Sequence, residues 1–165
     1  MLGFAMKVKK RTIYEAISFI TSAIFLAWFI WFLYHKNYEP LALKKLKQEN
    51  IQVGTKTFHV WIASTPREQT RGLMFVEHLP KDDGMLFTYH HSVMEPFWMK
   101  NTLIPLTVLF IKDGKVIKQM KMKPCHTIVC PLYSPNTEYN MALEINQTSQ
   151  NYVGQMVMVI DKNKN

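Results

Sequence analysis

The chain has 165 residues, a length that suits one domain with accessory segments. Hydrophobic residues make up 48% of it and charged residues only 19%, which favours a packed core and excludes a mainly disordered chain. The formal net charge is +8, and residues 1–50 hold eight Lys or Arg against three Asp or Glu. Residues 51–165 hold twelve against nine, so the folded part lacks the basic excess of a nucleic-acid-binding domain. We therefore expect no nucleic-acid partner.

The N-terminal segment has the pattern of a membrane anchor. Residues 16–34 carry no charge, and a helix of this length, at about 1.5 Å per residue, would reach roughly the 30 Å of a bilayer core. Basic residues precede this span, and Trp28, Trp31 and Tyr34 lie toward its far end. We expect a basic cytoplasmic N-terminus over residues 1–15, then a single transmembrane anchor in the lipid bilayer. A cleaved signal peptide is the alternative, which the absence of small residues after the apolar run disfavours.

The remainder of the chain is expected to lie outside the cytoplasm, with a linker over residues 35–50 and a β-rich domain over residues 51–161. Alternating apolar residues around Gly54 predict a hairpin over residues 51–63. Further strands are predicted at residues 85–89, 105–111, 116–122, 138–145 and 155–160, and a loop at residues 90–96. The predicted fold class is α+β, mainly β: a compact antiparallel sheet or small barrel with one or two short helices, preceded by the transmembrane helix.

One short helix has both of its ends marked in the sequence. Thr65 can cap its N-terminus, and Pro66 suits the first helical position. Glu68 completes a T-x-x-E capping box, and Gly72 is placed to end the helix. The sequence therefore predicts a helix of less than two turns between the first hairpin and the following strand.

Four motifs follow one another in the domain: RGLMF at residues 71–75, DGMLF at 83–87, FWMKNTLIPL at 97–106 and ALEI at 142–145. In this order they resemble domain-of-unknown-function family 192, also called UPF family 0127, over about residues 51–160. The resemblance implies a small, mainly β domain of bacteria or archaea, often with an export signal or membrane anchor, and no established activity. The family usually has Asp after I-P-L, where this chain has Thr107. If relatives catalyse a reaction through that Asp, this chain should have little or no activity. Ligand binding through other residues should persist.

The only two cysteines, Cys125 and Cys130, lie in the proline-bounded loop CHTIVC. Outside the cytoplasm an even pair predicts a disulfide. A redox-active pair is one alternative, although such pairs are typically C-x-x-C before a helix. A metal site is the other: Cys125, His126 and Cys130 offer soft ligands, and His90, His91 or methionines could complete the set. No spacing matches a zinc or copper pattern, so we expect no metal and no cofactor.

The stretch EPFWMKNTLIPLTVLF allows two interpretations. In the first, Trp98 and Met99 fill the core, Lys100 extends outward, and Asn101 and Thr102 form the turn before a core strand. In the second, Trp98, Lys100 and Asn101 line a pocket. An aromatic wall with a cation and an amide suits a small anionic or carbohydrate-like ligand.

Glu144 lies among apolar residues of a predicted strand, where a carboxylate is costly unless it is paired. We expect it to pair with Arg71 or Lys100, the basic residues of the same motif set. A position on the exposed side of the strand is the alternative.

The candidate ligand site therefore comprises Arg71, Trp98, Lys100, Asn101 and Glu144. We predict a membrane-anchored binding or accessory module whose partner is a small ligand or an envelope protein. The first alternative is a cell-envelope enzyme of the hydrolase type, for which the sequence shows no nucleophile motif or paired carboxylates. The second is a metal-handling protein. No residue is predicted to be catalytic.

Overall fold

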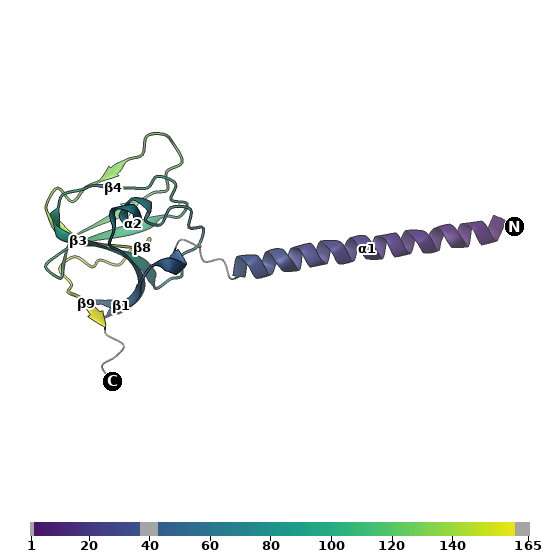
Figure 1. Ribbon diagram of the computed structural model, residues 1–165, viewed down its shortest axis with the longest axis horizontal. Coiled ribbons are helices and arrows are strands. Elements are labelled where there is room, and N and C mark those ends of the chain that lie inside the picture. Colours follow the sequence, from purple (N-terminus) through teal and green to yellow (C-terminus); the bar gives the residue numbers. More distant parts are fainter. Residues whose placement is uncertain (1, 37–42, 161–165) are drawn as a thin grey trace. The chain divides into compact units, whose positions relative to one another are not determined.

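The computed structural model describes residues 2–36 and 43–160, which belong to two separate compact units, Met1–Glu39 and Pro40–Asn165 (Figure 1). In the first unit, helix α1 (Leu2–Lys36) contains the predicted anchor. Large apolar side chains along it are exposed, among them Phe19, Phe25 and Trp28. Within the part of the chain that the structure describes, no helix is both long enough and apolar enough to cross a membrane. The predicted transmembrane helix therefore receives no support from the structure.

The second unit is built on a curled sheet of seven strands that forms a half-barrel, in the order β6-β5-β8-β3-β2-β1-β9 (Figure 1). A separate two-stranded ribbon pairs β4 with β7. The sheet confirms the predicted mainly β domain with few helices. The strands are β1 (Gln48–Val53), β2 (Lys56–Ala63), β3 (Asp83–Val93), β4 (Phe97–Trp98), β5 (Leu106–Lys112), β6 (Lys115–Met122), β7 (Leu132–Tyr133), β8 (Tyr139–Asn146) and β9 (Val157–Ile160).

Two differences from the predicted fold have clear physical reasons. The sheet is mixed and not purely antiparallel, because β2 and β3 pair in parallel. A parallel pair needs a crossover connection, and helix α2 (Pro66–Arg71) supplies it. The folded part also begins before residue 51: a 3-10 turn at Leu43–Lys45 and the start of β1 occupy the end of the predicted linker, and Leu43 is buried in the core.

Helix α2 begins and ends as predicted. The Thr65 side chain accepts a hydrogen bond from the Glu68 backbone N–H at 3.3 Å. The Glu68 carboxylate in turn accepts from the Thr65 N–H at 2.9 Å, which completes the capping box. Gly72 follows the last turn with a φ of 49°, and its N–H donates to the Glu68 carbonyl. These local interactions fix where Arg71 lies, at the C-terminal end of the helix.

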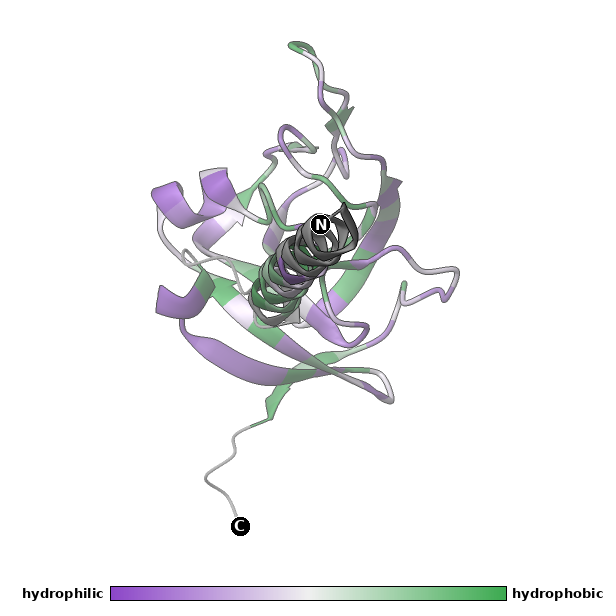
Figure 2. Ribbon diagram, turned by 90° about the vertical axis from the view of Figure 1, so that its right-hand side faces the viewer, coloured by the Kyte–Doolittle hydropathy of each residue, from purple (hydrophilic) through white to green (hydrophobic). Residues whose placement is uncertain are grey.

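Both faces of the sheet are buried, each by its own hydrophobic cluster. One cluster joins Ile51, Leu109 and Leu143 to Tyr152 of the loop after β8. The other joins Phe87, Val108, Phe110 and Ala142 to the segments that cross over that face, which contribute Leu73, Phe97 and Met99. Figure 2 shows the resulting pattern of apolar and polar residues along the strands. The second cluster carries the candidate site, because α2 and β4 belong to the segments beside it.

Candidate functional site

Four of the five predicted site residues line one small recess on the second cluster. Arg71 ends α2, Trp98 belongs to β4, Lys100 follows that strand, and Glu144 comes from the middle of β8. The volume of the recess is about 30 Å³. Its wall is completed by Gln69, Thr70, Gly72, Leu73, Met74, Phe87, Phe97 and Thr102. The sequence motifs, which are far apart along the chain, therefore meet at this recess.

Glu144 is buried, with 4% of its surface exposed, on a strand in the interior of the sheet. Its neighbours across the strands are apolar: Met85 on β3 and Val108 on β5. Burial in this setting raises the pKa of the Glu144 carboxyl to about 8. The interpretation that Glu144 faces water is therefore wrong, and its side chain is mostly uncharged at neutral pH.

The predicted ion pair with Arg71 or Lys100 is not formed. Among residues 2–36 and 43–160, no cation lies within ion-pair distance of the Glu144 carboxyl and no donor forms a hydrogen bond with it. Both cations nevertheless line the recess into which Glu144 faces. A buried acid without a partner is unfavourable for stability, and this is typical of sites that bind a ligand or transfer a proton.

Trp98 and Met99 have opposite environments, although the first interpretation placed both in the core. Met99 is fully buried, which confirms its part of the prediction. Trp98 is 42% exposed, and its partner across the β4–β7 ribbon, Leu132, is 66% exposed. The Lys100 ammonium lies 5.7 Å from the centre of the Trp98 ring, a cation–π contact that keeps the cation beside the recess.

Asn101 forms the turn and lines no part of the recess. Its φ of 56° is in the left-handed region that Asn tolerates better than most residues. Its backbone N–H donates to the Cys125 carbonyl at 3.2 Å, and its carbonyl accepts from the Phe75 N–H at 2.9 Å. The structure thus gives Asn101 the turn-forming role of the first interpretation, and its backbone hydrogen bonds also join the turn to the segments of Phe75 and Cys125.

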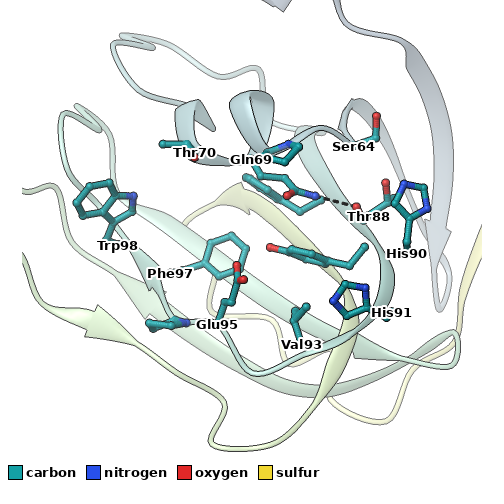
Figure 3. A pocket seen from close by; sticks show the side chains of 14 residues that line it. Ser64, Gln69, Thr70, Thr88, His90, His91, Val93, Glu95, Phe97 and Trp98 are labelled. Carbon is teal, nitrogen blue, oxygen red and sulfur yellow. Dashed lines mark hydrogen bonds between the residues drawn. The ribbon is translucent and has the colours of Figure 1, made fainter.

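A larger cleft adjoins the recess, with a volume of about 560 Å³ (Figure 3). Gln69, Thr70, Phe87, Phe97 and Trp98 line both. In Figure 3, Trp98 lies at one side of the cleft and the His90 and His91 side chains lie at the other. The remaining lining residues are Ser64, Pro66, Thr88, Tyr89, Val93, Glu95 and Pro96. This cleft was not predicted from the sequence.

An irregularity in β3 creates one wall of the cleft. Thr88 pairs with Met141 and Val93 pairs with Tyr139, so the four residues 89–92 of β3 stand opposite Asn140 alone. The extra residues bend the strand and turn its side chains toward the cleft, as β-bulges do near functional sites. Residues 90–93 were predicted as a loop but belong to the strand.

Tyr89 and Tyr139 connect this wall of the cleft to the core. Their rings meet edge to face at 5.5 Å, and the Tyr139 hydroxyl donates to the Glu95 carbonyl at 2.7 Å. Burial raises the pKa of Tyr89 to about 12, and the carboxyl groups of Glu95 and Glu144 add to this rise. Tyr89 thus lies within electrostatic range of both acids, one at the cleft and one at the recess.

The predicted disulfide between Cys125 and Cys130 is present and closes the loop, with Cα atoms 5.8 Å apart. Because both sulfurs are bonded to each other, they are not available as the thiolate ligands of the alternative metal site with His126. His90 and His91 line the cleft instead. In the part of the chain that the structure describes, no group of three or more His, Cys, Asp or Glu is placed to hold a metal ion.

Residues 48–154 match the family described as "Uncharacterized ACR", domain of unknown function 192. The chain belongs to this family. The DUF192 domain is also similar to two solved structures. One, from Sinorhizobium meliloti and described as a proposed transcription regulator, is 25% identical with a TM-score of 0.62, covering 69% of this chain and 95% of that one. The other, a protein of unknown function from Novosphingobium aromaticivorans, is 26% identical with a TM-score of 0.64, covering 73% and 89%. A comparison with curated proteins found no significant match.

Within the DUF192 domain, Thr107, which stands where the family usually has Asp, does not line the recess. Thr107 pairs with Ile145, which belongs to the cluster on the opposite face of the sheet from Glu144. Its hydroxyl is buried and accepts a hydrogen bond from the Thr148 N–H at 3.2 Å. An Asp carboxylate at this position could accept the same hydrogen bond. The replacement of Asp by Thr therefore concerns the attachment of the loop that contains Thr148, and it leaves the recess intact.

Proposed function

We propose that the cleft and the recess together bind a small carbohydrate-like or anionic ligand, and that the protein is a binding or accessory module. The observation that carries this proposal is Glu144, a buried acid that has no partner among the described residues and faces a recess lined by Arg71 and Lys100. Such an arrangement costs stability that an apolar residue of similar size would not cost, and costly groups of this kind are concentrated at functional sites.

The composition of the cleft supports a carbohydrate-like ligand. The half-exposed Trp98 offers an apolar ring surface beside the buried rings of Phe87 and Phe97, while Gln69 and Glu95 offer hydrogen-bonding groups on the same walls. A sugar ring combines an apolar face with a rim of hydroxyls, so it complements both kinds of wall. The volume of about 560 Å³ lies within the range of small-molecule sites, roughly 300–1,000 Å³.

A thermal-shift screen with sugars and sugar acids tests this proposal, because a ligand that binds only the folded state raises the apparent melting temperature. The Trp98→Ala variant should lose most of the shift caused by any sugar. Leu132→Ala is the matched control, because Leu132 pairs with Trp98 and is exposed but does not line the cleft. Equal shifts in Trp98→Ala and wild type would place the ligand elsewhere and refute the proposal.

A hydrolase is the second candidate, favoured by one observation. The raised pKa of Glu144, about 8, keeps a proton available at neutral pH, and Glu95 lines the adjoining cleft. In glycoside hydrolysis, Glu144 would donate its proton to the leaving oxygen as the glycosidic bond breaks. Water would add to the anomeric carbon and lose a proton to Glu95, which acts as the base. Release of reducing ends from cell-wall polysaccharide by wild type, and not by Glu144→Gln, would favour this candidate over binding alone.

We also propose that α1 attaches this module to a lipid surface of the cell envelope. The support is the row of exposed apolar side chains on α1, such as Ile20, Phe25 and Ile30, preceded in sequence by the basic residues of 7–11. The disulfide Cys125–Cys130 is consistent with an oxidising, extracytoplasmic compartment. Wild type should remain with membranes after alkaline carbonate washing, and a chain lacking residues 1–42 should be released; recovery of both in the soluble fraction would refute the attachment. Digestion of the domain by protease added to spheroplasts would support the extracytoplasmic location, and protection there would contradict it.

A further inference from the structure

We propose that the recess holds a carboxylate or another singly charged anionic group of the ligand, and that Glu144 donates a hydrogen bond to it as the protonated acid. This inference rests on the proposed function, because the rest of the ligand would occupy the adjoining cleft. Four properties carry it: the size of the recess, the charges around it, the state of Glu144, and the lining residues that the recess shares with the cleft.

The size of the recess limits what enters it. Its volume of about 30 Å³ corresponds to roughly one or two water molecules. A carboxylate fits this space, whereas a sugar ring or an aromatic ring does not. Because Gln69, Thr70 and Trp98 line both spaces, a group that enters the recess can belong to a ligand whose ring lies in the cleft.

The charges around the recess favour an anion. Helix α2 contributes Arg71, and the segment after β4 contributes Lys100. Strand β8 contributes only Glu144, and the Phe87 and Trp98 side chains from β3 and β4 are uncharged. Neither cation is paired with an acid among the residues that the structure describes, so both are available to a ligand.

Further titratable groups lie in the walls of the adjoining cleft. Strand β3 contributes Tyr89, His90 and His91, and Glu95 follows that strand. Burial raises the pKa of Tyr89 to about 12, so it is uncharged at neutral pH. These groups face the cleft, where the ring of the ligand would lie. They are unchanged in a Glu144→Gln variant, so any pH dependence of binding that they cause would persist there, and only the contribution of Glu144 would be lost.

The protonated state of Glu144 follows from its apolar neighbours, which raise its pKa to about 8. A ligand carboxylate beside it would favour the proton further, since two adjacent carboxyl groups share one proton more readily than both ionise. Binding of an anion should therefore be constant below pH 8 and weaken by up to about tenfold per pH unit above it, as the proton is lost. A ligand ammonium group would require ionised Glu144 and would be repelled by Arg71 and Lys100. Its affinity would therefore rise as the pH increases, opposite to that of an anion.

Glucuronate and glucose are a matched pair of probes, because they share a ring and differ at the C6 carboxylate. We expect the full-length protein to bind glucuronate at least tenfold more tightly than glucose at pH 7.5, as measured by isothermal titration calorimetry. Between pH 7.5 and 9.5 the affinity for glucuronate should fall at least tenfold, while that for glucose should stay level. Glu144→Gln, which keeps an N–H donor and has no proton to lose, should bind glucuronate at both pH values with equal affinity.

The contribution of Lys100 is tested separately. Lys100→Gln should remove most of the preference for glucuronate, whereas Lys123→Gln, a change of an exposed lysine outside the recess, should not. These variants and the pH titration of wild type keep the test valid if Glu144→Gln does not fold.

Equal affinities for glucuronate and glucose would overturn the inference and leave the proposed function of the cleft intact. A glucuronate affinity that rises with pH would overturn the inference as well. If neither sugar binds but acetate binds with the expected pH dependence, the recess is an anion site and the carbohydrate-like ligand is refuted. If none of the three binds, both proposals fail.

Discussion

Replacement of Glu144 by Gln should change how the stability of the protein depends on pH, whether or not a ligand is present. The carboxyl group is 4% exposed between Met85 and Val108, and burial raises its pKa to about 8 from an ordinary value of 4.5. The folded state therefore holds the Glu144 proton more tightly than the unfolded state does. Gln has nearly the same shape and no proton to lose.

The sign and size of the effect follow from the two pKa values. The stabilisation from the bound proton is fully present below pH 4.5 and is lost as pH rises through 8, because above that pH neither state binds the proton. Within this window the free energy of unfolding should fall by about 1.4 kcal/mol per pH unit, which amounts to at most about 5 kcal/mol. For a domain of marginal stability this is a large fraction of the total.

Urea unfolding followed by tryptophan fluorescence at pH 5, 6, 7 and 8 measures this dependence. We expect the difference in unfolding free energy between Glu144→Gln and wild type to grow by about 2–3 kcal/mol from pH 5 to pH 7, in favour of the variant. The exposed Glu77→Gln is the matched control, because it removes a carboxylate from the surface and should leave the slope unchanged. Parallel curves for wild type and Glu144→Gln across this range would show that Glu144 titrates normally and would refute the reasoning.

Three further predictions concern the disulfide loop, the opposite face of the sheet and the turn at Asn101. Replacing both Cys125 and Cys130 by Ser should lower the urea-derived unfolding free energy by about 2 kcal/mol, a modest loss because the ring that they close is small. A variant as stable as the oxidised wild type would contradict this. Thr107→Val should cost about 1–2 kcal/mol in the same assay by leaving the Thr148 N–H without its acceptor, and should not alter glucuronate affinity; a weakened affinity would show that the opposite face of the sheet matters for binding. Asn101→Ala should lower the thermal midpoint through the cost of a positive φ, about 1–2 kcal/mol, and Asn101→Gly should lower it less; the reverse order would argue for a role of the side chain.

The parts of the fold that could be predicted depend on local interactions. The hairpin at Gly54 and the capping box between Thr65 and Glu68 are confirmed, because each is decided within a few residues. The parallel pairing of β2 with β3 could not be predicted in the same way, because it depends on how the crossover through α2 packs. The prediction of a transmembrane helix, made from the uncharged span, its length and its basic and aromatic flanks, finds no support in the structure.

The candidate site shows the same division. Arg71, Trp98, Lys100 and Glu144 could be grouped from their motifs, and they line one recess. The cleft beside it was missed because the irregular pairing of residues 89–92 exists only in the assembled sheet. The pairing expected of Glu144 was wrong for a related reason: sequence shows that a buried acid needs a partner, but not whether the folded chain places one beside it.

The position of Lys100 has a consequence for the oxidation state of the protein. Lys100 forms an isolated β-bridge with Cys125, and the next residue, Asn101, donates its N–H to the Cys125 carbonyl. One wall of the recess is thus attached to the disulfide-closed loop. In a reducing compartment the Cys125–Cys130 bond would open, this attachment would loosen, and the ammonium group would be held less firmly beside Glu144. If the recess binds an anion as proposed, the reduced protein should bind that anion more weakly than the oxidised protein.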